Sequence, residues 1–214
     1  MNEIITGDCL EVYILSLGAG LNSTAMTFFI LENNLPLDVA VFADTGAELP
    51  ETYETVRLLS EFLRTKDIPL RIVKSKNGTL YDTCKRRRVI PSEIWRWSTR
   101  DYKLTPIHAY YRSLNAHIYE YIGIAYDEID RMKTSREPYI TKLYPLIDAK
   151  IDRVGCTEII KRAKFPEPIK SGCFFWPFNN GERWEYIKAQ HPKKYRLALE
   201  LEESNKYFPK QVLR

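Results

Sequence analysis

The chain has 214 residues, a length that fits one α/β domain with an appendage or two small domains. Apolar residues make up 44% of it and charged residues 28%, which excludes a disordered chain, and no apolar run reaches the roughly 18 residues of a membrane span. The N-terminus, Met1 to Glu3, lacks the basic start and apolar stretch of a signal peptide, so we expect a soluble cytoplasmic protein with no membrane contact. The net charge of +4 is too small by itself to indicate a nucleic-acid-binding protein.

The first predicted unit is a strand, a glycine turn and a helix. Residues Glu11 to Leu17 form a short apolar run rich in β-forming side chains, and Asn22 to Glu32 has helical spacing. Between them lies Gly18-Ala19-Gly20, whose small side chains leave backbone N–H groups free to wrap a phosphate. The start of the following helix adds positive potential. An ordinary tight turn between a strand and a helix is the alternative interpretation.

Further strands alternate with helices along the chain. We predict strands over Leu37–Ala43, Leu70–Val73 and Ile118–Ala125, and helices from about Pro50 to Leu63 and from near Pro106. This alternation favours a parallel sheet with helices on both faces, a Rossmann-like α/β fold. Ligands of such sheets bind at the carboxyl ends of the strands, so we expect the binding residues there.

The amino-acid composition of the sequence changes beyond about residue 140, where prolines become frequent. We therefore predict a nucleotide-binding domain over residues 1–140 and a small subdomain of loops and short helices over residues 141–214, packed on it. A polar helix from about Pro192 to Ser204 is expected near the end of the subdomain.

The segment from Lys85 to Arg112 is strongly basic, because eight Lys or Arg residues against two acidic ones give it a local charge of +6. Aromatic residues interleave with these cations, namely Trp95, Trp97, Tyr102, Tyr110 and Tyr111. Phosphates pair with cations and bases stack on aromatic rings, so the segment is a candidate surface for RNA or DNA. A solvated helix face is the equally weighted alternative.

Several motifs together resemble one protein family. Ser16-Leu17-Gly18-Ala19-Gly20-Leu21-Asn22-Ser23 is similar to the phosphate loop of the PP-loop ATP pyrophosphatases, or adenine nucleotide alpha-hydrolases, and the chain most resembles their phosphoadenosine phosphosulfate (PAPS) reductase branch. The motifs that carry the resemblance further are Phe42–Gly46 with Glu51-Thr52, Trp97–Ile107, Gly123–Glu128 with Arg131, Tyr144–Ile147 and Ser171–Phe178. They occur in the family's order between about residues 12 and 200.

The resemblance implies that the chain binds ATP with Mg²⁺ and cleaves it to AMP and pyrophosphate, adenylating an acceptor in sulfur transfer or nucleic-acid modification. It implies nucleotide-binding roles for Ser16, Gly18, Ala19, Gly20, Asn22, Ser23, Asp44, Thr45, Gly46 and Gly123. Catalytic roles fall to Arg100 and Lys103, which would neutralise pyrophosphate, and to Asp127, which with Glu128 and Arg131 would hold Mg²⁺ or orient the acceptor. For each charged residue, a solvated charge or a helix cap is the alternative.

The chain also departs from the family pattern. Asn22 stands where the family usually has an Asp, which removes a carboxylate from the metal site. Relatives that ligate an iron–sulfur cluster have four cysteines, where this chain has Ser98, Cys156, Cys173 and Trp176. We therefore expect no iron–sulfur cluster, with a three-cysteine site completed by Cys84 as the alternative. Cys156 and Cys173 remain the candidate metal ligands, with core packing or a disulfide between them as alternatives.

Two other functions remain open. A PAPS reductase-type sulfonucleotide oxidoreductase is less favoured, because that chemistry in the family uses a C-terminal cysteine and none follows Cys173. A non-catalytic nucleotide- or nucleic-acid-binding relative is consistent with Asn22, Ser98 and Trp176. The sequence is also compatible with a homodimer, and it identifies neither the acceptor nor a sulfur donor.

Overall fold

The computed structural model describes residues 10–92 and 96–205, so Trp95 of the basic segment lies outside the described residues. Five strands form one sheet, and they are β1 (Glu11–Leu17), β2 (Val39–Asp44), β3 (Leu70–Lys74), β4 (His117–Ile122) and β5 (Ile140–Leu143). Their spatial order is β3-β2-β1-β4-β5, and every neighbouring pair is parallel. All five carboxyl ends therefore meet along one edge of the sheet, as the α/β prediction requires.

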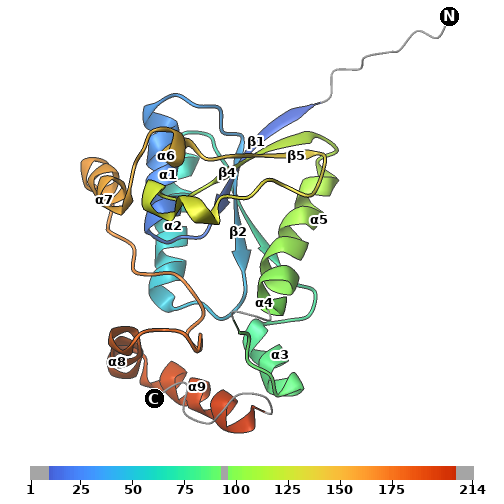
Figure 1. Ribbon diagram of the computed structural model, residues 1–214, viewed down its shortest axis with the longest axis vertical. Helices are drawn as coiled ribbons and strands as arrows, with labels where there is room; N and C mark the ends of the chain where they lie inside the picture. The colour runs from blue at the N-terminus through green and yellow to red at the C-terminus, as the bar shows by residue number, and fades with distance from the viewer. Residues whose placement is uncertain (1–9, 93–95, 206–214) are drawn as a thin grey trace, which may run out of the picture.

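The helices surround this sheet and extend beyond its carboxyl edge (Figure 1). They are α1 (Leu21–Glu32), α2 (Pro50–Arg64), α3 (Leu80–Arg87), α4 (Trp97–Thr99), α5 (Thr105–Ser113), α6 (Pro145–Asp148), α7 (Arg153–Arg162), α8 (Gly181–Gln190) and α9 (Pro192–Ser204). A π-helical turn, η1 (Arg100–Leu104), leads into α5, and a 3₁₀ segment, η2 (Tyr126–Arg131), follows β4. Among the described helices, none is both long and apolar enough to cross a membrane.

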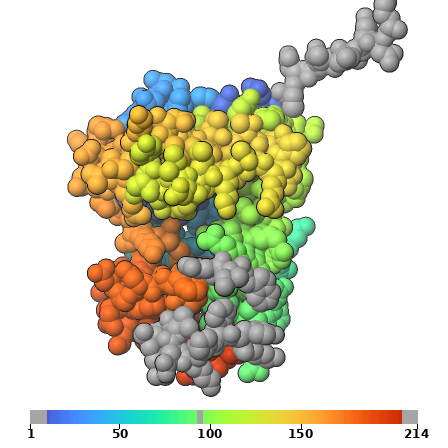
Figure 2. All heavy atoms as spheres, in the orientation of Figure 1, coloured from blue at the N-terminus to red at the C-terminus, as the bar shows by residue number. Residues whose placement is uncertain are grey.

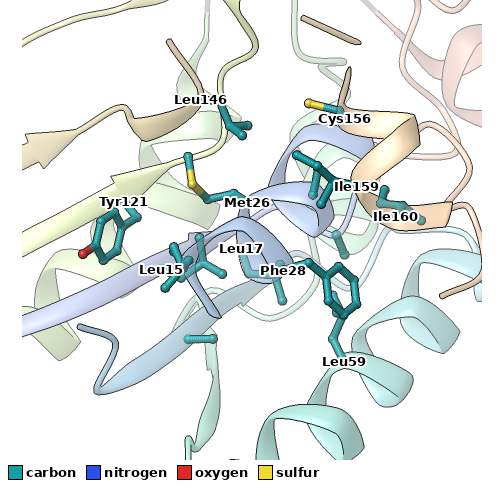
Figure 3. Close-up of a cluster of buried hydrophobic side chains, with 14 of the residues drawn as sticks. Leu15, Leu17, Met26, Phe28, Leu59, Tyr121, Leu146, Cys156, Ile159 and Ile160 are labelled. Atoms are coloured by element: carbon teal, nitrogen blue, oxygen red, sulfur yellow. The ribbon is translucent and has the colours of Figure 1, made fainter. Parts of the chain in front are cut away.

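The largest apolar cluster lies on the sheet face that α1, α2 and α7 cover. Leu15 and Leu17 of β1 pack there with Met26 and Phe28 of α1 and with α7 (Figure 3). Helix α1 is buried on most of its circumference, because the sheet lies on one side of it and α7 on another. Residues after 140 thus complete the core of the sheet domain.

The opposite sheet face is covered by α5. Ile14 of β1, Val41 of β2 and Ile118 of β4 pack there against Ile107 and Tyr111 of α5. Successive residues of a strand contribute in turn to the two apolar clusters. This period of two is expected for a sheet that is buried on both faces.

A third cluster lies beyond the carboxyl edge of the sheet, where Figure 1 shows α3, α8 and α9 below the end of β2. It joins Leu80 and Cys84 of α3 to Phe175, Trp184 and Leu201. The cluster therefore combines residues from both sides of the predicted boundary at residue 140.

Two expectations need correction. Residues 141–214 were expected to contain only loops and short helices, but Ile140–Leu143 is a fifth strand paired with β4. Three central aromatics of the basic segment, Trp97, Tyr102 and Tyr111, were expected to offer rings for base stacking, but all three are buried. Tyr102 donates a 2.5 Å hydrogen bond to Thr83, so its ring and hydroxyl both serve the core.

Helix α7 provides a test of this core assignment. Ile160 is fully buried and Val154 on the same helix is 67% exposed. We expect Ile160→Ala to lower the free energy of unfolding by about 2–5 kcal/mol, because it leaves a cavity, and Val154→Ala to change it by less than about 0.5 kcal/mol. Urea unfolding followed by circular dichroism measures both, and equal stabilities would contradict the placement of α7 in the sheet core.

Candidate functional site

A cavity of about 860 Å³ opens at the carboxyl edge of the sheet. It is lined by Ser16, Gly18, Gly20, Leu21, Asn22, Ser23, Ile122, Gly123, Ile124, Glu128, Arg131, Arg153 and residues 167–171. Figure 2 shows this face hollowed below the yellow-green residues around η2, with blue atoms of the N-terminal third in its depth. Several residues predicted from one short motif therefore share a wall with segments more than a hundred residues away.

The cavity lies between the ends of β1 and β4, which are neighbours in the sheet. The helix that follows β1 covers one face of the sheet, and the helix that precedes β4 covers the other. The chain therefore reverses its winding direction between these two strands. A crevice forms outside the strand ends at such a switch point, and ligands of open α/β sheets bind there.

The loop from Ser16 to Ser23 forms one wall. Ala19 is fully buried with a left-handed φ of +53°, so the chain turns sharply between β1 and α1. Helix α1 begins with neither a side-chain cap nor an acidic residue in its first turn. Because the first N–H groups of a helix lack intrahelical partners, the start of α1 presents free donors and positive potential to the cavity.

The end of β4 lies unusually close to this helix start. A Cβ added at Gly123 would lie 2.6 Å from Ser23 Cα and 2.8 Å from Ser23 N, so only glycine allows this approach of two backbones. On the other side, a Cβ added at Gly20 would lie 2.8 Å from Ser171 Oγ. The first turn of α1 is thus held between β4 and the 171 segment.

Asn22 is linked to the opposite wall. Its Nδ2 donates a 2.7 Å hydrogen bond to Glu128, and the other oxygen of Glu128 accepts a 2.7 Å hydrogen bond from Arg131. Asn22 Oδ1 is buried without a hydrogen-bond partner. A carboxylate from η2 therefore lies beside the position where the family pattern has an Asp, and among the described residues the amide oxygen of Asn22 accepts no hydrogen bond.

Three cations contribute to the cavity from separate segments, Arg131 of η2, Arg153 at the start of α7 and Lys170. Arg131 is paired with Glu128. Among the described residues, neither Arg153 nor Lys170 takes part in an ion pair. Glu128 and Glu167 also line the cavity, so its three cations exceed its carboxylates by one, and this small positive excess suits an anionic ligand.

The Asp44–Gly46 turn, predicted to bind nucleotide, does not line this cavity. Asp44 accepts hydrogen bonds of 2.8 Å from both Gly46 N and the Tyr53 hydroxyl, and its other oxygen lies 3.1 Å from Lys74 Nζ. Burial raises the pKa of Asp44, but these three partners outweigh it and leave the pKa below its usual value. Ala19 also points away from the cavity lining, into the core.

The three residues with predicted catalytic roles lie elsewhere as well. Arg100 is 72% exposed and paired with Asp101, and Lys103 Nζ lies 3.9 Å from the buried carboxylate of Glu48. Asp127 accepts a 3.1 Å hydrogen bond from Arg153 N, at the start of α7. The cavity brings together Ser16, Gly18, Gly20, Asn22, Ser23 and Gly123 but none of these three.

The three described cysteines, Cys84, Cys156 and Cys173, lie in two separate clusters and form no disulfide with one another. Cys156 lies in the cluster between α1 and α7, whereas Cys84 and Cys173 belong to the cluster below the sheet, and all three are free thiols. Burial raises the pKa of Cys156 and of Cys173 to about 12, so neither is a thiolate near neutral pH. Among the described residues, no group of three or more His, Cys, Asp or Glu gathers in a metal-binding arrangement. The alternative of a Cys156–Cys173 disulfide is therefore wrong.

Sequence reasoning gave no place in the site to Arg153 or to residues 167–170. Arg153 is a single cation in a polar stretch, and Lys170 is one of many exposed lysines, so neither carries a local signal. Ser171 begins the Ser-Gly-Cys motif, and this motif was the sequence signal that could have indicated a role for this segment.

A smaller cavity of about 380 Å³ lies between the end of β3 and α5. Its lining includes Lys74, Lys76, Pro106 and Tyr110, and it contains none of the loop residues between β1 and α1. It therefore offers no comparable set of backbone donors.

The contact between Gly123 and α1 generates a prediction. Gly123→Ala is expected to lower the free energy of unfolding by about 1–3 kcal/mol, because its methyl group would overlap backbone atoms that have no room to move. Gly18→Ala, whose added Cβ would meet nothing closer than 3.6 Å, is the matched control and should be close to wild type. Urea denaturation compares them, and a Gly123→Ala protein as stable as Gly18→Ala would refute the close packing.

Comparisons with known proteins support the architecture. No family model matches the sequence, and no curated protein matches it either. A U34-tRNA thiolase, NcsA, from Methanococcus maripaludis, solved with its [4Fe-4S] cluster, is similar in structure with a TM-score of 0.57 and 15% identity, over 98% of this chain and 77% of that one. A PAPS reductase from Candida auris, solved with phosphate, has a TM-score of 0.54 and 18% identity, over 78% of each chain. The chain therefore shares the fold of these two structures, a parallel α/β sheet with helices packed alongside it.

Proposed function

We propose that this chain binds ATP in the cavity at the carboxyl edge of the sheet and cleaves it between the α- and β-phosphates, transferring AMP to an acceptor. The observation that carries the proposal is the cavity at the switch point, with the uncapped start of α1 on one wall and the cations Arg153 and Lys170 on the other. Its volume of about 860 Å³ leaves space for an acceptor group beside the nucleotide.

The loop between β1 and α1 is assigned to the β- and γ-phosphates. The backbone N–H groups at the start of α1 and the hydroxyl of Ser16 supply hydrogen-bond donors, and the helix dipole favours negative charge at this point. Mg²⁺ that arrives with ATP would find the Asn22 amide oxygen and the Glu128 carboxylate as protein ligands, and it would neutralise phosphate charge there.

The cations of the facing wall are assigned to the reaction itself. When the acceptor forms a bond to the α-phosphorus, the bond from that phosphorus to the bridging oxygen breaks and pyrophosphate leaves with the electron pair. We assign to Arg153 and Lys170, which line the cavity, the stabilisation of the negative charge that develops on that leaving group. They take over the role that sequence reasoning gave to Arg100 and Lys103.

A nucleic-acid acceptor agrees with the charge of the surface beyond the strand ends. Lys85, Arg86, Arg87 and Arg88 are all exposed around the end of α3, and Arg96 and Arg100 are exposed nearby in sequence. Because Trp97, Tyr102 and Tyr111 are buried, this surface would contact phosphates rather than stack on bases. The structural similarity to an enzyme that thiolates tRNA is further support for this acceptor class.

The nature of the cleaved bond tests the activity. With ATP labelled at the α- or γ-phosphate and a total tRNA fraction as acceptor, we expect the γ-label in pyrophosphate and the α-label on the adenylated acceptor, from which hydrolysis releases it as AMP. Thin-layer chromatography separates the products. ADP with inorganic phosphate would contradict the proposed cleavage, and tight ATP binding without turnover would indicate a non-catalytic relative.

Two variants of α7 serve as a matched pair for this assay. Arg153→Met removes a cation from the cavity wall, whereas Lys161→Met removes an exposed cation from the same helix outside it. Arg153→Met should reduce the rate of pyrophosphate release by about 10- to 100-fold, and Lys161→Met should leave it near wild type. Equal rates for the two variants would refute the assigned role of Arg153.

A further inference from the structure

A carboxylate is buried in the sheet directly beside the phosphate-binding loop. Glu120 of β4 is 5% exposed and faces α5, where its Oε1 accepts a 2.9 Å hydrogen bond from the Tyr111 hydroxyl. Glu120 pairs in register with Ile14 of β1, and Ser16 lies two residues further along on the same face. Ser16 and Glu120 are therefore diagonal neighbours across two central strands.

The Ser16 hydroxyl joins the buried group to the cavity. Its position beside Glu120 and Tyr111 lets it interact with both side chains, and Ser16 also lines the cavity wall. The described polar groups that face Glu120 are Tyr111 from α5, Ser16 from β1 and Lys142 from β5. The remaining surroundings on this face are apolar, including Ile14 and Ile118.

The protonation state of Glu120 decides which way the Ser16 proton points. An ionised carboxylate only accepts hydrogen bonds, so it takes the single proton of Ser16 and leaves lone pairs toward the cavity. A protonated carboxyl donates to a neighbouring hydroxyl, and the Ser16 proton is then free to bond a phosphate oxygen. The ionised form also places a negative charge next to the anion site, so both effects favour phosphate binding to the protonated form.

We propose that Glu120 is a positioning residue that orients the Ser16 hydroxyl and couples phosphate binding in the cavity to the uptake of one proton. The proposal rests on the proposed function, because it takes the polyphosphate of ATP as the ligand of the loop. The Glu120 side chain does not touch the ligand, yet its protonation state controls the affinity of the site for the polyphosphate.

The sign of the resulting pH dependence follows from the burial of Glu120. Burial raises the pKa of this carboxyl above its usual value, and the hydrogen bond from Tyr111, the charge of Lys142 and the hydrogen bond from Ser16 oppose it only in part. Affinity for the polyphosphate is therefore high below this pKa and falls as the pH rises through it. By linkage, bound phosphate raises the same pKa further.

The test compares the wild-type protein with Glu120→Gln by calorimetry across neutral pH, with the ATP analogue that has a methylene group between the α- and β-phosphates. The analogue cannot be cleaved at the proposed bond, and its own titration affects both proteins equally. We expect the wild type to lose about tenfold more affinity than Glu120→Gln between low and high pH, and Glu120→Gln to bind more tightly than wild type at the high end. Damage to the fold would weaken binding instead.

A second variant keeps the proposal testable if Glu120→Gln does not fold. Tyr111→Phe retains the carboxyl but removes a hydrogen bond that stabilises its ionised form, so the loss of affinity should shift to higher pH. Parallel pH profiles for the wild type and the variants would overturn the role of Glu120 while leaving ATP binding intact. Absence of binding by every protein, wild type included, would overturn the proposed function and this inference together.

Discussion

The close approach of the β4 end to the first turn of α1 is the constraint on which the site depends. Gly123 has no side chain, so the β4 backbone reaches Ser23 at a distance that no other residue would permit. This contact fixes the start of α1 between two central strands and leaves its free N–H groups at the cavity. Ala19 is fully buried and has a positive φ, which turns the chain sharply before α1. Packing around Ala19 and around Gly123 therefore holds the conformation of the loop.

The cavity has one wall of backbone donors and one wall of side-chain cations, and the two come from distant parts of the chain. Glu128 connects them, because it accepts hydrogen bonds from Asn22 on one side and from Arg131 on the other. Beneath the donor wall, Glu120 adds a titratable group inside the sheet. The proposed polyanion binding would therefore rest on preorganised dipoles and separate charges, with a pH dependence set by Glu120.

The sequence was informative where a local pattern determines structure. The run from Glu11 to Leu17 predicted β1 with the observed bounds, and the small residues after it predicted a loop that now lines the cavity. The strand Ile140–Leu143 was missed, because it has only four residues, two of them polar, and prolines on both sides. A pattern of alternating apolar residues cannot be recognised over so short a stretch.

Residues whose roles depend on tertiary placement could not be predicted. Trp97, Tyr102 and Tyr111 lie among cations in the sequence, yet the fold turns their rings inward and the cations outward. Arg153 and Lys170 reach the cavity only because α7 packs on α1 and the chain then crosses in front of the loop. The predicted domain boundary at residue 140 remains a prediction, and β5, α6 and α7 all pack with the sheet domain.

The central claim is that the loop between β1 and α1 binds the polyphosphate of a nucleotide. A crystal structure of the protein with Mg²⁺ and the methylene-bridged ATP analogue tests it most directly. The account predicts phosphate oxygens within hydrogen-bond distance of the backbone N–H groups at the start of α1. Nucleotide bound only in the cavity between β3 and α5, or a loop free of nucleotide at millimolar concentration of the analogue, would contradict it.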